Sequence, residues 1–229
     1  MRKVSVLMPI HNGEKYLPRA LDSIYVQSYE DFEVVAVLNN CTDNSAEILK
    51  DFDATVVYCD TPGIVPALNT GIMYCEGELV ARMDVDDFWY ETKLEKQVEF
   101  LDNNPNISIV GTQIRRVDVN GNEIESQVRY PVEDSQIKQT LMNGSNCIAH
   151  PSVVFRKSII ERAGIYDDSF PLAEDYHYWL RCLRWYNFAN LDEVLVDYTS
   201  NPNPNYNPNV PLIACRTMLF LYKNLGLIG

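Results

Sequence analysis

The first hundred residues alternate between short, continuous apolar runs and segments with helical periodicity, and this alternation restricts the fold more than any other feature. The apolar runs fall at residues 4–8, 32–38, 54–58 and 78–84, and the last of them ends in acidic residues. Runs of this length are typical of strands buried on both faces, and strands that alternate with helices form a parallel sheet. We therefore predict an α/β domain whose central sheet is mostly parallel and flanked by helices.

The pattern changes near Asn106. Strands are expected within residues 107–128, with a type I′ turn at Asn120-Gly121, and again at 151–155 and 193–198. Helices are expected at 16–24, after an N-cap at Thr42 or Asp43, and at 63–75, 89–105, 157–164 and 174–186. We divide the chain into residues 1–105, residues 106–200 with mixed β structure in the same domain, and 201–229, an Asn/Pro linker with a terminal helix.

The composition excludes several classes of protein. A net charge of −13 over 229 residues argues against nucleic acid and against simple electrostatic binding to anionic membranes. An anionic substrate would need a bound cation. Six cysteines without CxxC spacing, and an N-terminal apolar run too short for a signal sequence or a membrane span, favour a cytoplasmic protein with reduced thiols. The terminal helix is expected to pack on the domain, on a second subunit in a homodimer, or at a membrane surface on the inner face.

Acidic residues gather directly after the strand at 78–83. Asp84, Asp86 and Asp87 stand where the carboxyl end of that strand should lie, and ligands of open α/β sheets bind at this edge. Carboxylate oxygens are the ligands that Mg²⁺ and Mn²⁺ prefer, so a metal or ribose site is one interpretation. The alternative is that the acids cap the following helix.

Five segments in order carry a resemblance to a known family. They read VSVLMPIHNGEKYL, QSYEDFEVVAVLNNCTDNS, GIVPALNTGI, RMDVDD and HPSVVFRKSIIERAGIYDDSFPLAEDYHYWLR. Together they resemble family 2 glycosyltransferases of the GT-A fold, from Val4 to about Tyr198. The resemblance implies a Rossmann-like domain that inverts the sugar it transfers from a nucleotide-sugar donor to a hydroxyl.

The resemblance also implies roles for single residues. Asp175 would be the catalytic base, although an acid beside Glu174 at a helix start is also an ordinary capping residue. Asp86 and Asp87 would hold Mn²⁺ or Mg²⁺, with Asp84 and Asp86 beside the donor. His150 and Glu174 would lie near the acceptor or the diphosphate, and a lone His is otherwise often structural.

The nucleotide would be bound by residues from the first loops and strands: Pro9, His11, Asn12, Glu14, Asn39 and Asn69. For His11-Asn12-Gly13 the alternative is a simple turn. Asn39 replaces the family's usual Asp, and its amide can still read uracil or thymine. Leu68 replaces a frequent Arg. Thr199, Ser200 and Asn201 replace an Arg and a His that many relatives carry, so this part of the site is expected to work differently.

These features predict a glycosyltransferase of surface polysaccharide or glycan synthesis that uses a UDP- or dTDP-sugar and a glycan or lipid-linked acceptor. A nicotinamide-binding enzyme is disfavoured because no G-x-G-x-x-G follows the first strand. A sugar nucleotidyltransferase would need a Gly-rich basic loop there. The remaining alternative is a non-catalytic nucleotide-sugar-binding module of the same fold.

Overall fold

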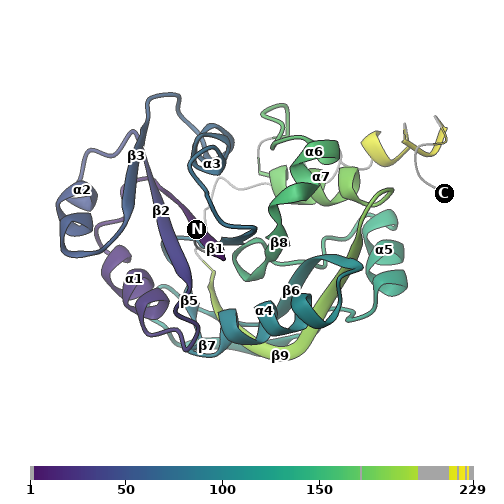
Figure 1. Cartoon of the computed structure of the whole chain (residues 1–229), viewed down its shortest axis with the longest axis horizontal. Coiled ribbons are helices and arrows are strands. Elements are labelled where there is room, and N and C mark those ends of the chain that lie inside the picture. The colour runs from purple at the N-terminus through teal and green to yellow at the C-terminus, as the bar shows by residue number, and fades with distance from the viewer. Residues whose placement is uncertain (1–2, 171, 201–216, 221, 225, 227–229) are drawn as a thin grey trace.

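The computed structural model describes residues 3–170, 172–200, 217–220, 222–224 and 226. They form one mixed sheet flanked by helices (Figure 1). The strands are β1 Val4–Ile10, β2 Phe32–Asn39, β3 Thr55–Cys59, β4 Leu79–Arg82, β5 Phe88–Trp89, β6 Ile107–Val117, β7 Glu123–Val128, β8 Val154–Arg156 and β9 Asn187–Thr199. The α-helices are α1 Leu17–Tyr25, α2 Ser45–Ile48, α3 Ile64–Ile72, α4 Lys93–Asn103, α5 Asp134–Met142, α6 Ile160–Ala163 and α7 Glu174–Cys182. The short 3₁₀ helices are η1 Leu49–Asp51, η2 His150–Ser152 and η3 Lys157–Ile159.

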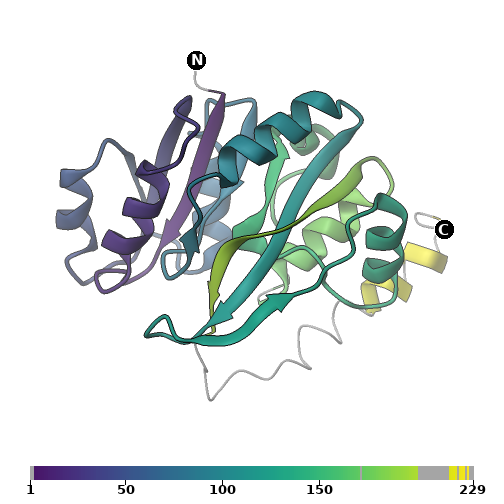
Figure 2. The same ribbon diagram turned by 90° about the horizontal axis from the view of Figure 1, so that it is seen from below.

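The strand order is β3-β2-β1-β4-β8-β6-β9-β5, with β7 paired to β6. The first four strands in this order are parallel. From β8 onward the pairing is mixed: β8 is antiparallel to β4 and β6, whereas β9 is parallel to β6. Figure 2 shows the long strands β6 and β9 running side by side. The last part of β6 also forms a hairpin with β7. The predicted fold class, a mostly parallel first half joined to a mixed second half, is confirmed.

The core lies on both faces of the sheet, as the continuous apolar runs predicted. One cluster of buried side chains joins the sheet to α1, η1 and α4, and the other joins it to α3, α5, α6 and α7. Gly71 of α3 is required by close packing, because a Cβ there would come within 2.3 Å of Leu7 Cδ1 and 2.6 Å of Val37 Cγ2. The helix α3 therefore lies almost directly on β1 and β2.

Two local predictions need correction. The hairpin at Asn120-Gly121 exists, but Gly121 has φ +83° and Asn120 is not among the non-glycine residues with positive φ. A type I′ turn needs positive φ at both central positions, so the turn is of another type, closed by the Gly121 N–H donating to the Asp118 carbonyl at 2.9 Å. The N-cap of α2 is Asn44, not Thr42 or Asp43. The strand β5 and the helix α5 were not predicted.

The expected linker and the start of the terminal helix lie outside the described residues. Residues 217–220 and 222–224 are helical. Leu219 is buried in the same cluster as α7, and Tyr222 packs against that cluster. Within the described part of the chain, no helix is long and apolar enough to cross a membrane.

Candidate active site

The three acids of the sequence cluster come together in the loop between β4 and β5. One carboxylate oxygen from each of Asp84, Asp86 and Asp87 lies within 4.8 Å of the others. Asp87 is buried, and Asp84 and Asp86 are partly buried. The loop leaves the carboxyl end of a parallel strand, which is the edge where ligands of α/β sheets bind.

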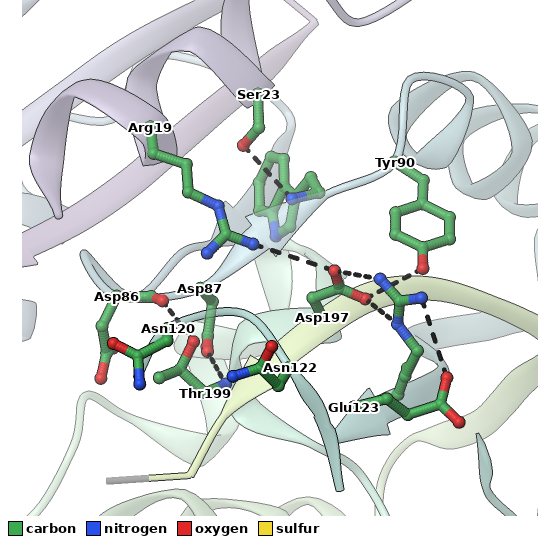
Figure 3. A network of polar contacts seen from close by, with 12 residues as sticks. Arg19, Ser23, Asp86, Asp87, Tyr90, Asn120, Asn122, Glu123, Asp197 and Thr199 are labelled. Carbon is green, nitrogen blue, oxygen red and sulfur yellow. Dashed lines mark hydrogen bonds and ion pairs between the residues drawn. The ribbon is translucent and has the colours of Figure 1, made fainter. Parts of the chain in front are cut away.

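The end of β9 binds this loop through two hydrogen bonds (Figure 3). The Thr199 backbone N–H donates to Asp87 Oδ1 at 2.7 Å, and the Thr199 hydroxyl donates to the Asp86 carbonyl at 2.5 Å. The second carboxylate oxygen of Asp87 is buried without a hydrogen-bond partner among the described residues. A buried oxygen in this state needs either a proton or a cation.

The electrostatics of the loop point to a cation. Burial, followed by the charge of Asp84, raises the pKa of Asp86 to about 6. Burial and then Asp84 and Asp86 raise the pKa of Asp87 well above its usual range. Two or three carboxylates in contact resist ionisation together, and a divalent ion removes this repulsion. An all-oxygen donor set with one unpaired oxygen fits Mg²⁺ or Mn²⁺.

A cleft of about 720 Å³ opens beside this loop. It brings residues from both halves of the chain together. The predicted residues that line it are Asp84, His150, Glu174 and Asp175. Asp86 and Asp87 are not part of its lining. A cleft of this size is typical of a small-molecule site.

Asp175 is the second residue of α7 and faces the cleft. Its Oδ2 accepts from Asn146 Nδ2 at 2.8 Å and its Oδ1 accepts from the Tyr176 backbone N–H at 2.6 Å. The N-cap of α7 is Ala173, and Asp175 lies in the first turn, where it accepts from one of the amide groups that have no partner within the helix. Burial raises the pKa of Asp175. Each oxygen has a further lone pair, so the carboxylate is able to accept a proton from a hydroxyl in the cleft.

Glu174 and His150 lie deeper in the same cleft. Burial, then the charge of Asp175, raises the pKa of Glu174 to about 7, and its Oε1 is 3.9 Å from His150 Nδ1. His150 Nε2 shares a hydrogen bond of 2.9 Å with the Tyr166 hydroxyl. Burial and the nearby Arg82 lower the pKa of His150 well below its usual range, so the ring is neutral at pH 7. His150 thus has structural partners and still lines the cleft.

The residues predicted for the first loop hold neighbouring loops together. His11 Nδ1 is 2.7 Å from the Asn39 carbonyl, and Asn12, which has φ +50°, accepts from the Thr42 N–H at 2.8 Å. The carboxylate of Glu14 accepts from the backbone and side-chain N–H groups of Asn44 at 2.9 and 3.0 Å. Pro9 is buried within β1. Residues 11 and 12 form a bend at the carboxyl end of β1, and a hydrogen-bonded turn starts at the Gly13 carbonyl, which accepts from the Tyr16 N–H at 2.9 Å.

Two predicted contacts to the nucleotide are already used inside the chain. Asn69 binds the backbone of Tyr166 in both directions, each at 2.9 Å. One N–H and one lone pair of its amide remain, so its contact to the nucleotide stays a prediction. Asn39 is 4% exposed and donates to the carbonyls of Cys59 and Thr61, while its oxygen accepts from the Gly63 N–H. Asn39 keeps one lone pair on its oxygen but no free N–H.

Sequence reasoning missed several polar residues of the cleft, and two of them contact the predicted acids. Arg82, 1% exposed, forms an ion pair with Asp84 and lies among the acids of the cleft. Its signal was a charged residue in an otherwise apolar strand. Asn146, which binds Asp175, lies in a segment without periodicity, so nothing in the local sequence marked it.

Comparisons with known proteins agree with this geometry. The family model described as "Glycosyl transferase family 2" matches residues 5–164. The chain is 34% identical to the O-antigen biosynthesis glycosyltransferase WbnJ of Escherichia coli, over 85% of this chain and 78% of that protein. It is 30% identical to the amylovoran biosynthesis glycosyltransferase AmsE of Erwinia amylovora, over 84% of this chain and 74% of that protein.

Solved structures share the fold. TarS 1–349 of S. aureus in complex with UDP-GlcNAc has a TM-score of 0.77 at 20% identity, with 96% of this chain and 66% of that chain covered. The mannosyltransferase PcManGT of Pyrobaculum calidifontis in complex with GDP-Man and Mn²⁺ has a TM-score of 0.66 at 23% identity, with 90% and 59% covered. The chain thus spans just under two thirds of these structures' length.

Proposed function

The chain belongs to glycosyl transferase family 2, and from this premise we propose that it moves a sugar from a nucleoside-diphosphate donor to a hydroxyl of a glycan or lipid-linked acceptor, with inversion at the anomeric carbon. As a member of this family the chain is a glycosyltransferase, which sets aside the non-catalytic binding module. The observation that carries the finer proposal is the shared cleft of Asp84 and Asp175. Asp84, which is proposed to lie beside the donor, and Asp175, the proposed base, both line this cleft.

In the proposed step, Asp175 accepts the proton of the acceptor hydroxyl while that oxygen forms a bond to C1 of the donor sugar. The bond between C1 and the phosphate oxygen breaks, and its electron pair leaves with the nucleoside diphosphate. One placed carboxylate is enough for this single displacement, and general-base catalysis contributes roughly 10²–10⁴-fold. The hydrogen bonds from Asn146 and the Tyr176 N–H hold the carboxylate in one orientation.

Asp86 and Asp87 are the proposed metal ligands, with Asp84 beside them on the cleft side. When bound, Mn²⁺ or Mg²⁺ supplies positive charge that stabilises the diphosphate leaving group. The unpaired, buried oxygen of Asp87 and the all-carboxylate donor set support this assignment. PcManGT, which has the same fold, was solved with Mn²⁺.

We assign donor binding to residues 1–105 and acceptor binding with the base to residues 106–200. The nucleoside would lie at the carboxyl ends of β1 and β2, beside Pro9, His11, Asn12 and Glu14. A uracil or thymine base is proposed, which fits the UDP-GlcNAc complex of TarS; PcManGT binds GDP-Man. The names of WbnJ and AmsE support an acceptor in polysaccharide synthesis. A lipid-linked acceptor would place the enzyme at the inner face of a membrane.

The purified chain should be incubated with Mn²⁺ and a panel of UDP-, dTDP- and GDP-sugars while release of nucleoside diphosphate is measured. We expect release from a UDP- or dTDP-sugar, loss of release in excess chelator, and recovery when Mn²⁺ is restored. NMR of the glycosylated product should show the anomeric configuration opposite to that of the donor. Retained configuration would contradict the single displacement, and release in chelator would contradict the metal site.

A further inference from the structure

Thr199 is the last residue of β9, and the reaction proposed above gives it no part. We propose that Thr199 is a positioning residue for the metal site: it fixes Asp86 and Asp87 from the end of β9. This inference rests on the proposed function, since it assumes that these acids hold a divalent cation. It assigns a role to a residue that the sequence marked only as a departure.

Thr199 is the one described residue whose hydrogen bonds reach both acids. Its N–H binds the side chain of Asp87, and its hydroxyl binds the backbone carbonyl of Asp86, so one residue fixes a carboxylate and the neighbouring peptide. Thr199 is 7% exposed, which shields both bonds from water. A further bond of 3.3 Å, from the Asp87 N–H to the Asp84 carbonyl, closes the loop on itself.

The strand that carries Thr199 is itself anchored by an ion cluster around the buried Asp197 (Figure 3). Asp197, 4% exposed, receives two bonds from Arg115 of β6, at 2.8 and 2.6 Å. The hydroxyl of Tyr90 donates to the same carboxylate at 2.9 Å, and Arg19 of α1 lies 3.9 Å away. Three segments distant in sequence thus converge on one side chain, two residues before Thr199.

The strand pairing ties this anchor to the acidic loop. β5 begins at Phe88, directly after Asp87, and pairs with β9 through Phe88↔Asp197 and Trp89↔Val196. The loop is therefore held at β4 on one side and at β9 on the other. The backbone is thus restrained on both sides of the three acids, whose charges repel. Supports of this kind, which orient the ligands of a metal, typically change metal affinity 10–100-fold when they are removed.

The test compares three variants by a measurement that needs no turnover: Mn²⁺ affinity of the donor-free protein, from electron paramagnetic resonance of the free ion. Thr199→Val keeps the shape and backbone N–H but removes the hydroxyl bond. Thr199→Ser keeps the hydroxyl. Thr112→Val is the matched control, because Thr112 is also fully buried and its hydroxyl also donates to a backbone carbonyl, at 2.8 Å. Thr112 pairs with Leu191, eight residues before Thr199 on β9.

We expect Thr199→Val to weaken Mn²⁺ binding about 10-fold, and Thr199→Ser and Thr112→Val to stay within about twofold of the wild type, with thermal unfolding confirming that all are folded. Equal affinity in Thr199→Val and the wild type would overturn the proposal, as would an equal loss in Thr112→Val. An equal loss in Thr199→Ser would also do so, since the hydroxyl would then be irrelevant. A wild type that binds no Mn²⁺ would instead refute the metal site of the proposed function.

Discussion

At the residue scale, the proposed chemistry depends on acids of the cluster that have no basic partner. Arg82 compensates Asp84, but Asp86 and Asp87 have no basic partner within salt-bridge distance in the described structure. Asp43, in contrast, gains hydrogen bonds from Ser45 and the Glu14 N–H that lower its pKa. Asp43 therefore stabilises a loop, whereas Asp86 and Asp87 remain available to bind a ligand.

The raised pKa of Asp86 predicts an unusual pH dependence. Because its pKa is about 6 in the folded chain and near 4 when unfolded, this residue favours folding below about pH 4, and that stability is lost as the pH rises through 6. Asp86→Asn should therefore make the metal-free protein more stable at pH 7, on the order of 1–3 kcal/mol, with the gain fading toward pH 4. Denaturant unfolding in chelator at both pH values measures this.

Saturating Mn²⁺ should reverse the order at pH 7, because a neutral amide binds the cation more weakly than a carboxylate does. Asp192→Asn is the control, since the Asp192 side chain is 68% exposed on the surface. A gain for Asp86→Asn that is the same at pH 4 and pH 7 would rule out ionisation as its cause.

The role of a residue could be predicted where its motif and its position in the fold agreed. It could not be predicted where the side chain binds the backbone of a distant part of the chain. The three acids of the cluster lie together, and Asp84 of this cluster shares a cleft with Asp175. Asn69 and Asn39 match the family by position, but the structure commits their amides to the backbones of Tyr166 and the β3–α3 loop. Such contacts join residues up to 97 positions apart, which no local pattern reveals.

At the element scale, strands and helices with strong hydrophobic periodicity were predicted well. The other elements form because tertiary contacts stabilise them. β5 has two residues and exists because β9 offers it an edge. α5 begins in a polar segment, and only Ile137 and Leu141 of its residues are buried, so its sequence carries little helical signal. The long strand β9 continues through polar residues because β6 pairs with it along its length.

The close packing of α3 on the sheet predicts a stability change remote from the site. Gly71→Ala should destabilise the fold by about 1–3 kcal/mol, because the new methyl would overlap Leu7 and Val37 in a packed core. The melting temperature should fall by roughly 2–10 °C. Thr70→Ala on the same helix is the control. A Gly71→Ala variant as stable as the wild type would show that α3 can shift away from the sheet.

At the scale of the whole molecule, one sheet joins a parallel half to a mixed half, and the cleft lies at that junction. Asp84 follows β4, whereas Asp175 begins α7, and β8 is the strand through which the two halves pair. The sequence predicted both halves, because the β-α-β rhythm ends near Asn106. It could not predict the cleft wall, which is formed by the hairpin of β6 and β7 and by segments without periodicity.

The net charge of −13 acts at this scale as well. The cleft lining contains four acids and two arginines, Arg82 and Arg116, so its surface does not attract a diphosphate by itself. A divalent cation at the acid cluster would change the sign of the field where the donor must bind. The negative charge of the chain therefore explains why the proposed binding of a diphosphate donor needs a metal ion.

The central claim is that this glycosyltransferase uses Asp175 as its base, and one comparison tests it most directly. Turnover of the nucleotide sugar that the wild type accepts should be measured for Asp175→Asn in Mn²⁺, together with donor binding by calorimetry. We predict that turnover falls by about 10²–10⁴-fold while donor affinity stays within a few-fold, because the amide fits the same space but cannot accept the proton. Turnover equal to that of the wild type, with the variant folded and donor bound, would contradict the account.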